Sequence, residues 1–352
     1  MMEHKGVNYD VGTVLGLKWR PDYDPQVVKR ELEIIKNDLH CNAVGISGKD
    51  IGRVVVTAEA ALSQGLEAWL NPADWNDIPP ESTLAYITEA ARAAETLHAG
   101  HPGKVVLSIG SEFTLFMQGI VPGKTLMQRA VTVRKTDIIQ TGQHNQPLND
   151  FLGKTVTEVR KVFSGPIMYR SLVWEHVDWS NFDIIGVDHY WAEQIKDRYV
   201  DMVKPLFAYG KPVINTGFGF NTTAAPVTGM LATLGDAPGL SLARLLHQQP
   251  VIGRFIRPKL KVISERDEAV QAKRLVDNLK LLDGAGFSGA FMDTFILSIF
   301  PYSDTPKYDL DRTNSSLVKY FEGGRHGTTY PDMTWEPKEA FRAVAAYYAG
   351  TE

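Results

Sequence analysis

The sequence contains a single cysteine, Cys41, so no disulfide bond can form within the chain. No run of about 18 apolar residues is present, which excludes an ordinary membrane-spanning helix. The first ten residues, MMEHKGVNYD, lack the basic and apolar regions of a secretory signal. We therefore expect a cytoplasmic protein that has no membrane partner.

The chain also lacks an excess of positive charge. Its 41 acidic and 37 basic residues give a net charge of −4, which argues against a nucleic-acid partner held through phosphate contacts. Apolar residues make up 44% and charged residues 22%, as in soluble proteins with a large core. No linker rich in proline, glycine or serine divides the 352 residues, so we predict one domain over residues 1–352.

Several short motifs of cofactor and nucleophile chemistry are missing. No glycine-rich phosphate turn follows the first predicted strand, and no Gly-x-Ser-x-Gly elbow occurs. Glu112, Asp188, His189 and Asp293 carry atoms that can bind metals, but the sequence has no His-x-His or His-Glu-x-x-His pair. We predict no cofactor and no metal, and a metal site stays a minor alternative.

The chain does contain a repeated rhythm of a short apolar run followed by an amphipathic segment. Strands are predicted over residues 6–9, 42–47, 66–70, 105–112, 166–171, 182–189, 212–216 and 289–295. Helices are predicted over residues 25–39, 51–64, 80–99, 149–163, 200–209, 267–284 and 337–349. After the fifth strand, residues 174–179 predict only a turn.

Strands that alternate with helices indicate an α/β fold with a parallel sheet. An open doubly wound sheet is the alternative, but the missing phosphate turn favours closure into a single (β/α)8 TIM barrel. Three connections are too long for simple loops: residues 113–150, 217–266 and 296–336, after strands 4, 7 and 8. All three are expected at the C-terminal end of the barrel, where they would form lids and pockets, unless they reflect drift or a homo-oligomer contact.

The stretch Val105–Phe116, VVLSIGSEFTLF, is the clearest sign of a functional site. Alternation places large apolar side chains on one face of the strand and Ser108, Gly110 and Glu112 on the other. Barrel enzymes keep their chemistry at the C-terminal ends of the strands, so Glu112 is a candidate general acid. The alternatives are that Glu112 caps the next helix or pairs with an arginine.

Other polar or aromatic side chains follow the remaining strands, and alternation directs Asp188, Asn215 and Asp293 toward the same basin as Glu112. Carboxyl groups that share a poorly solvated basin push their pKa values apart, and this keeps one of them protonated. The predicted catalytic residues are Glu112, Asp188 and Asp293. The predicted substrate-binding residues are Asn8, Tyr9, Trp69, Asn71, Ser111, His189, Tyr190, Asn215 and Gly217.

Structural roles compete with these assignments. Asp188 could instead bind backbone amides or Arg170, and Asp293 could pair with a cationic residue of a lid. His189 follows Asp188 directly, so alternation can place it behind the barrel wall. About half of the aromatic side chains near the strand ends are expected to serve packing alone.

The chain resembles the clan of retaining glycoside hydrolases with a (β/α)8 barrel, and more closely an actinobacterial group of glycosidase-like barrels labelled abortive infection proteins. The matching stretches are KGVNYDVGT, ELEIIKNDLHCNAVGISG, SIGSEFTLFMQGIVPG, FDIIGVDHY, YDLDRTNSSLVKYF and GTTYPDMTWEPKEAFRAVAAYYA. The resemblance implies that Glu112, at the end of strand 4, is the acid/base residue.

Three positions depart from the clan's pattern. Ser111 stands where the clan usually has asparagine, and Gly217 stands at the position of the nucleophilic glutamate on strand 7. Gly45 replaces an arginine that supports this nucleophile in the clan. The resemblance therefore implies a barrel without its nucleophile, with two glycines that should leave a larger and less polar basin.

Glycine has no atom that could attack a sugar carbon, so ordinary retaining hydrolysis is disfavoured. The main hypothesis is an enzyme that uses general acid/base chemistry (cyclisation, ring opening, dehydration or isomerisation) on a small molecule of specialised metabolism. An inverting or substrate-assisted glycoside hydrolase is one alternative. A non-catalytic ligand-binding or phage-defence protein is the other.

Overall fold

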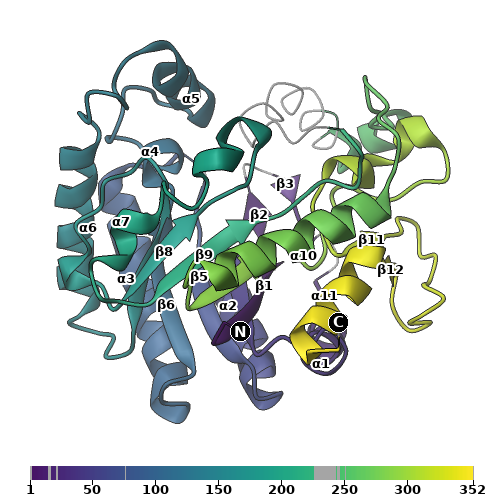
Figure 1. Ribbon diagram of the computed structural model, residues 1–352, viewed down its shortest axis with the longest axis horizontal. Helices are drawn as coiled ribbons and strands as arrows, with labels where there is room; N and C mark the ends of the chain where they lie inside the picture. Colours follow the sequence, from purple (N-terminus) through teal and green to yellow (C-terminus); the bar gives the residue numbers. More distant parts are fainter. Residues whose placement is uncertain are drawn as a thin grey trace.

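The computed structural model describes residues 2–14, 17–20, 23–75, 77–225, 243, 246–249 and 251–351. Eight parallel strands close a barrel, as predicted, and β1 pairs with both β4 and β10 to complete the ring (Figure 1). Around the ring these strands are β1 (His4–Asp10), β4 (Ala43–Gly48), β5 (Glu67–Pro72), β6 (Val105–Ser111), β7 (Ile167–Leu172), β8 (Ile184–Asp188), β9 (Val213–Phe218) and β10 (Gly289–Met292).

Helices connect the strands and pack outside the barrel (Figure 1). The longer ones are α1 (Pro25–Asn37), α2 (Ile51–Ser63), α3 (Pro80–Gly100), α5 (Leu126–Lys135), α6 (Asn145–Val159), α10 (Glu268–Gly284) and α11 (Glu339–Ala349). Asp24, Asp50 and Asp267 accept hydrogen bonds from backbone N–H groups in the first turns of α1, α2 and α10. These caps fix where the three helices begin. None of the helices that the structure describes has both the length and the apolarity needed to cross a bilayer.

Some predicted elements differ from the observed ones. The helix predicted over residues 200–209 is a single turn, α7 (Lys204–Phe207), preceded by the 3-10 helix η2 (Glu193–Arg198). The predicted turn after the fifth strand is followed by a short 3-10 helix, η1 (Trp179–Asn181). Two small hairpins, β2–β3 (Thr13–Val14 and Leu17–Lys18) and β11–β12 (Val318–Tyr320 and Trp335–Pro337), were not predicted. Strands of two or three residues are too short to produce a periodic pattern.

The connections after β6, β9 and β10 lie at the C-terminal end of the barrel. The first contains α4 (Phe113–Phe116), α5 and α6, and the third contains the 3-10 helices η4 (Pro306–Tyr308) and η5 (Leu310–Thr313) and the β11–β12 hairpin. Within the connection after β9, residues 226–242, 244, 245 and 250 lie outside the described residues. The described part of it includes the 3-10 helix η3 (Ile252–Phe255).

The inside of the barrel changes from apolar to polar along the strands. Near the N-terminal ends of the strands, the barrel is filled by an apolar plug of buried side chains: Ala43, Trp69, Val106, Met168, Ile184, Ile214 and Phe291. The next inward positions toward the C-terminal end are occupied by buried polar residues, among them Asn8, Ser47, Asn71, Arg170 and Asp188. The plug holds the strands at a fixed separation, and the polar layer above it is the candidate site.

Candidate active site

Asp188 at the end of β8 lies at the centre of a hydrogen-bonded group. Its Oδ1 accepts from Arg170 Nη2 at 3.0 Å and from Thr216 Oγ1 at 2.8 Å, and its Oδ2 accepts from Ser111 Oγ at 3.4 Å. Arg170 also donates to the carbonyl of Thr216 at 2.8 Å. The structural alternative for Asp188, a pair with Arg170, is thus what the structure contains, and this pair joins β7, β8 and β9.

A second group surrounds Asp293, which directly follows β10. Asn8 Nδ2 donates to Asp293 Oδ1 at 2.8 Å, and the Tyr190 hydroxyl donates to Oδ2. Burial raises the pKa of Asp293, and the Arg170 guanidinium opposes this increase. Neutral donors therefore bind both oxygens of Asp293, and the nearby positive charge of Arg170 favours its ionised form. No described lid residue forms an ion pair with Asp293.

Glu112 reaches the site through an unusual backbone conformation. It has a positive φ of 49°, and its backbone N–H donates to the carbonyl of Arg170 at 2.9 Å. The side chain is 4% exposed, and Oε2 has no hydrogen-bond partner among the described residues. Burial and the negative charges of Asp188 and Glu175 raise the pKa of Glu112 well above its usual range, although Arg170 opposes the increase. Burial and these charges therefore favour the protonated form of Glu112, which is the form that a general acid needs.

The inward-facing side chains of β6 and β9 differ from the predicted ones. The β6–β7 register shifts between Ser108 and Ser111, so β6 ends at Ser111, whose hydroxyl points to Asp188. On β9, Thr216 contacts Asp188, whereas Asn215 points outward and donates to the carbonyl of His189 at 3.1 Å. The prediction that Asn215 faces the basin is wrong, because Ile214 lies in the apolar plug inside the barrel, and regular alternation from Ile214 places Asn215 outside and Thr216 inside.

Three other predicted substrate-binding residues lie away from this site. Tyr9 is fully buried on the outer face of β1, where its hydroxyl bonds Glu31 of α1. Trp69 belongs to the apolar plug and packs on Phe291 with ring centroids 4.9 Å apart. His189 Nε2 donates to the carbonyl of Tyr199 at 2.7 Å, behind the barrel wall. Burial lowers the pKa of His189 to about 4, so it is neutral at physiological pH.

Asn71 does lie among the inward polar side chains, and its Nδ2 donates to Ser47 Oγ at 3.0 Å. Its Oδ1 is buried without a partner among the described residues. A buried unpaired amide oxygen costs free energy unless a ligand or water donates to it. Asn71 is therefore a candidate contact for a substrate hydroxyl.

Sequence reasoning missed two buried carboxyl groups, Asp10 and Glu175. Asp10 lies two residues after Asn8, so the alternation of β1 could have identified it. Burial raises the pKa of Asp10 to about 7 despite a hydrogen bond from Gly12 N–H. Glu175 lies in the loop after β7, where no periodic signal exists, and accepts hydrogen bonds from Leu172 N–H and the Tyr169 hydroxyl.

Gly217 and Gly45 do not open the basin, contrary to the sequence-based expectation. A Cβ on Gly217 would lie 2.7 Å from Asp188 Oδ1, 3.0 Å from Arg170 Nη2 and 3.1 Å from the Tyr190 hydroxyl. A Cβ on Gly45 would overlap the side-chain oxygen of Asn8. Polar side chains from neighbouring strands occupy the space next to both glycines, so the site is polar and closely filled.

Known structures share this architecture. A GH113 β-1,4-mannanase is 15% identical, with 99% of each chain covered and a TM-score of 0.58. A GH113 β-mannanase from Alicyclobacillus acidocaldarius is 14% identical over 100% of this chain and 98% of its own, with a TM-score of 0.56. A β-glucuronidase from Ruminococcus gnavus is 14% identical over 99% of this chain and 49% of its own, with a TM-score of 0.55.

The chain has the (β/α)8 barrel fold that these structures also have. At these identities the likeness concerns the fold alone. No family model matches the chain, and neither does any curated protein. The comparisons support the resemblance to glycoside hydrolase barrels and give no support to the closer resemblance to abortive infection proteins.

The space next to Gly217 can be tested by mutation. We expect Gly217→Ala to lower the free energy of unfolding by about 1–3 kcal/mol, because the new methyl group must displace the buried Asp188–Arg170 pair. Urea unfolding measures the change. Gly153→Ala is the control: Gly153 lies in α6 with nothing within 4 Å of the added Cβ, so alanine should stabilise the helix by about 1 kcal/mol. An equally tolerated Gly217→Ala would show that the space is open.

Glu175 should make stability depend on pH. Burial raises the pKa of Glu175 from 4.5 to about 7, so the folded state binds more protons than the unfolded state between these values. The wild type should therefore lose stability relative to Glu175→Gln as the pH rises from about 4.5 to 7, by up to about 3 kcal/mol. Urea unfolding of both proteins at pH 5 and pH 8 measures this difference. A difference that does not change with pH would show that Glu175 ionises normally.

Proposed function

We propose that the protein is an enzyme that uses Glu112 as a general acid on a small-molecule substrate. The observation that carries the proposal is a buried carboxyl group, at the C-terminal end of β6, which has an unpaired oxygen and a raised pKa. Among the described residues no cation forms an ion pair with Glu112. A carboxyl group that served only the fold would be expected to have its hydrogen bonds satisfied.

The proposal gives Asp188 the role of keeping Glu112 protonated. Arg170, Thr216 and Ser111 all donate to Asp188, which stabilises its negative charge. That charge, and a hydrogen bond between the two carboxyl groups, add to the effect of burial on the pKa of Glu112. The same donors occupy Asp188 and leave it poorly suited to attack a sugar carbon.

Retaining hydrolysis fits this arrangement poorly. It requires a nucleophilic carboxylate about 5 Å from the acid, and Gly217 offers no side chain at the end of β9. An inverting mechanism requires a second carboxylate that is free to activate a water, whereas neighbouring side chains already donate hydrogen bonds to both Asp188 and Asp293. We therefore favour reactions that need proton donation without a protein nucleophile: cyclisation, ring opening, dehydration or isomerisation.

The polar lining also bears on the substrate. The amide of Asn71 and the hydroxyls of Ser111 and Tyr190 can bind oxygen-rich groups. We propose a small, oxygenated substrate from specialised metabolism, whose ring or ether oxygen receives the proton of Glu112. The Asp188 charge would stabilise the positive charge that develops on carbon as the C–O bond breaks.

The test uses purified protein, a panel of aryl glycosides, and a panel of glycals, cyclic ketals and epoxides. We expect no retaining turnover of the glycosides. We expect acid-catalysed turnover in the second panel that falls about 10²–10⁴-fold in Glu112→Gln. Glu89→Gln, an exposed change on α3, is the control and should leave turnover unchanged.

Each other outcome contradicts the proposal. Glycoside turnover with retention of configuration would restore the retaining mechanism, and turnover with inversion would support the inverting alternative. Binding of panel compounds without turnover would support a non-catalytic ligand-binding protein. Turnover that Glu112→Gln leaves intact would assign the acid to another residue.

A further inference from the structure

Residues 251–263, VIGRFIRPKLKVI, form an exposed apolar segment in the connection after β9. Its side chains Val251, Phe255, Val262 and Ile263 are exposed by 50% to 86%, with Phe255 the most exposed. Large apolar side chains scattered singly on a surface are ordinary, but four within thirteen residues are a concentration. The segment therefore presents an apolar surface that the described part of the chain does not cover.

The same segment is strongly basic. It contains Arg254, Arg257, Lys259 and Lys261 and no acidic residue, in a chain whose net charge is −4. Arg257, Lys259 and Lys261 are exposed, and no described carboxylate forms an ion pair with any of them. The Arg257 guanidinium stacks on the Tyr308 ring at 3.8 Å, which leaves the N–H groups at its edges free to donate.

The fold holds this segment in place. The backbone N–H of Leu260 donates to the carbonyl of Lys307 at 2.8 Å, and His247 Nδ1 lies 2.6 Å from the carbonyl of Ile256. Directly after the segment, Arg312 Nη1 donates to the carbonyl of Ser264 at 2.7 Å. The exposed apolar side chains are thus displayed from an anchored backbone.

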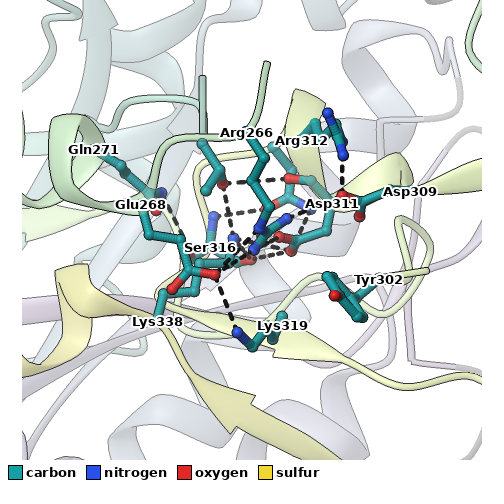
Figure 2. Close-up of polar contacts among 12 residues, drawn as sticks. Arg266, Glu268, Gln271, Tyr302, Asp309, Asp311, Arg312, Ser316, Lys319 and Lys338 are labelled. Carbon is teal, nitrogen blue, oxygen red and sulfur yellow. Dashed lines mark hydrogen bonds and ion pairs between the residues drawn. The ribbon is translucent and has the colours of Figure 1, made fainter. Parts of the chain in front are cut away.

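Next to these contacts lies a network of ion pairs between mostly buried side chains, which Figure 2 shows. Arg266 contacts Glu268 at 2.8 Å, Asp311 at 2.9 Å and Asp309 at 3.2 Å, and Lys338 contacts Asp311 at 2.9 Å. This network connects the start of α10 to the connection after β10 and to the residue before α11. Because the backbone of residues 251–263 is already held in place, the segment would lose little conformational entropy on binding.

We propose that residues 251–263 dock this protein on an anionic membrane surface. Interfacial segments combine Lys and Arg, which contact lipid headgroups, with Phe and Val, which enter the boundary of the acyl chains. A protein partner fits less well, because the cores of protein interfaces are depleted in lysine. The proposal departs from the sequence-based expectation of no membrane partner, which rested on the lack of a spanning helix, and surface docking needs no such helix.

The position of the segment determines which end of the barrel would face the membrane. It follows β9, so it lies at the same end of the barrel as Glu112. A membrane bound through Phe255 and Val262 would face this end of the barrel. The proposal does not depend on the acid chemistry proposed for Glu112, since it uses none of those residues.

The test is co-sedimentation of the full chain with vesicles of phosphatidylcholine alone and with about one third phosphatidylglycerol. We expect binding only to the anionic vesicles, and weaker binding as salt increases. Phe255→Ser combined with Val262→Ser should weaken it at least about tenfold. Lys259→Glu combined with Lys261→Glu should abolish it. Met127→Ser, which changes an exposed apolar residue of α5, is the control and should bind as the wild type does.

Thermal unfolding of each variant establishes that it is folded, since all the substituted side chains are exposed. Absence of binding, equal binding to neutral vesicles, or unchanged binding of both double variants would overturn the proposal. The main alternative is that a second copy of the chain binds this segment, and size-exclusion chromatography tests it. A dimer that Phe255→Ser disperses, together with no vesicle binding, would identify the segment as a self-association surface instead.

Discussion

Replacement of Arg170 by methionine is expected to lower the free energy of unfolding by about 3–5 kcal/mol at neutral pH. Arg170 forms the buried ion pair with Asp188 and also bonds the carbonyl of Thr216. Methionine fills much of the same volume but leaves the Asp188 charge without a cation in a poorly solvated site. Urea unfolding at pH 7 measures the loss.

A second substitution identifies the cause of this loss. In the Arg170→Met variant the buried carboxylate of Asp188 has no cation beside it, which is costly in a poorly solvated site. Adding Asp188→Asn to Arg170→Met should recover part of the stability at pH 7.

Arg160→Met is the matched control for this experiment. Arg160 pairs with Asp183 on the surface, where both side chains are at least one third exposed. Surface pairs contribute about 0–1 kcal/mol, so this variant should remain close to the wild type. An Arg170→Met variant as stable as Arg160→Met would show that water enters the site freely enough to solvate Asp188.

Lys338→Met is expected to lower the free energy of unfolding by about 3 kcal/mol. Lys338 is fully buried, and its ammonium group contacts Asp311 at 2.9 Å and the hydroxyls of Thr222 and Ser316 at 3.2 Å (Figure 2). Its removal leaves buried oxygen atoms without a donor, which is costly in a dry environment. Because Arg266 still pairs with Asp311, the expected loss lies at the lower end of the range for buried pairs.

Lys273→Met provides the comparison. Lys273 lies on the outside of α10 and pairs with Asp277 one turn away, so its replacement should change stability by no more than about 0.5 kcal/mol. Differential scanning calorimetry of both variants measures the contrast. If both unfolded at the wild-type temperature, the network in Figure 2 would not hold the connection after β10.

The barrel was predictable because its signal repeats along the chain. Short apolar runs alternate with amphipathic segments, and the absence of a phosphate-binding turn removed the main alternative. Helix α5 was missed, since it is a weakly amphipathic helix that buries Arg129 rather than an apolar stripe. The guanidinium of Arg129 bonds the carbonyl of Leu115 at 2.6 Å, a contact within the connection after β6 that local periodicity does not encode.

The candidate site was predictable only in part. The placement of Glu112 followed from the apolar strand before it, and Asp188 and Asp293 do lie near the C-terminal ends of their strands. Asn215 was misplaced because Val213 and Ile214 are both apolar, so the sequence does not show which of them faces inward, and Ile214 is the inward one. Glu175 was missed because its position depends on a loop. The closeness of Asp188 and Arg170 to Gly217 could not be predicted, since it arises from three strands together.

The closed ring of strands also bears on how the chain is synthesised. One edge of β1 pairs with β4 close by in the sequence, but its other edge waits for Gly289–Met292. Until β10 has been synthesised, the backbone groups on this edge of β1 are unpaired and can bond a strand of another chain. Molecular chaperones that shield nascent chains should therefore raise the yield of native protein, most of all before β10 emerges.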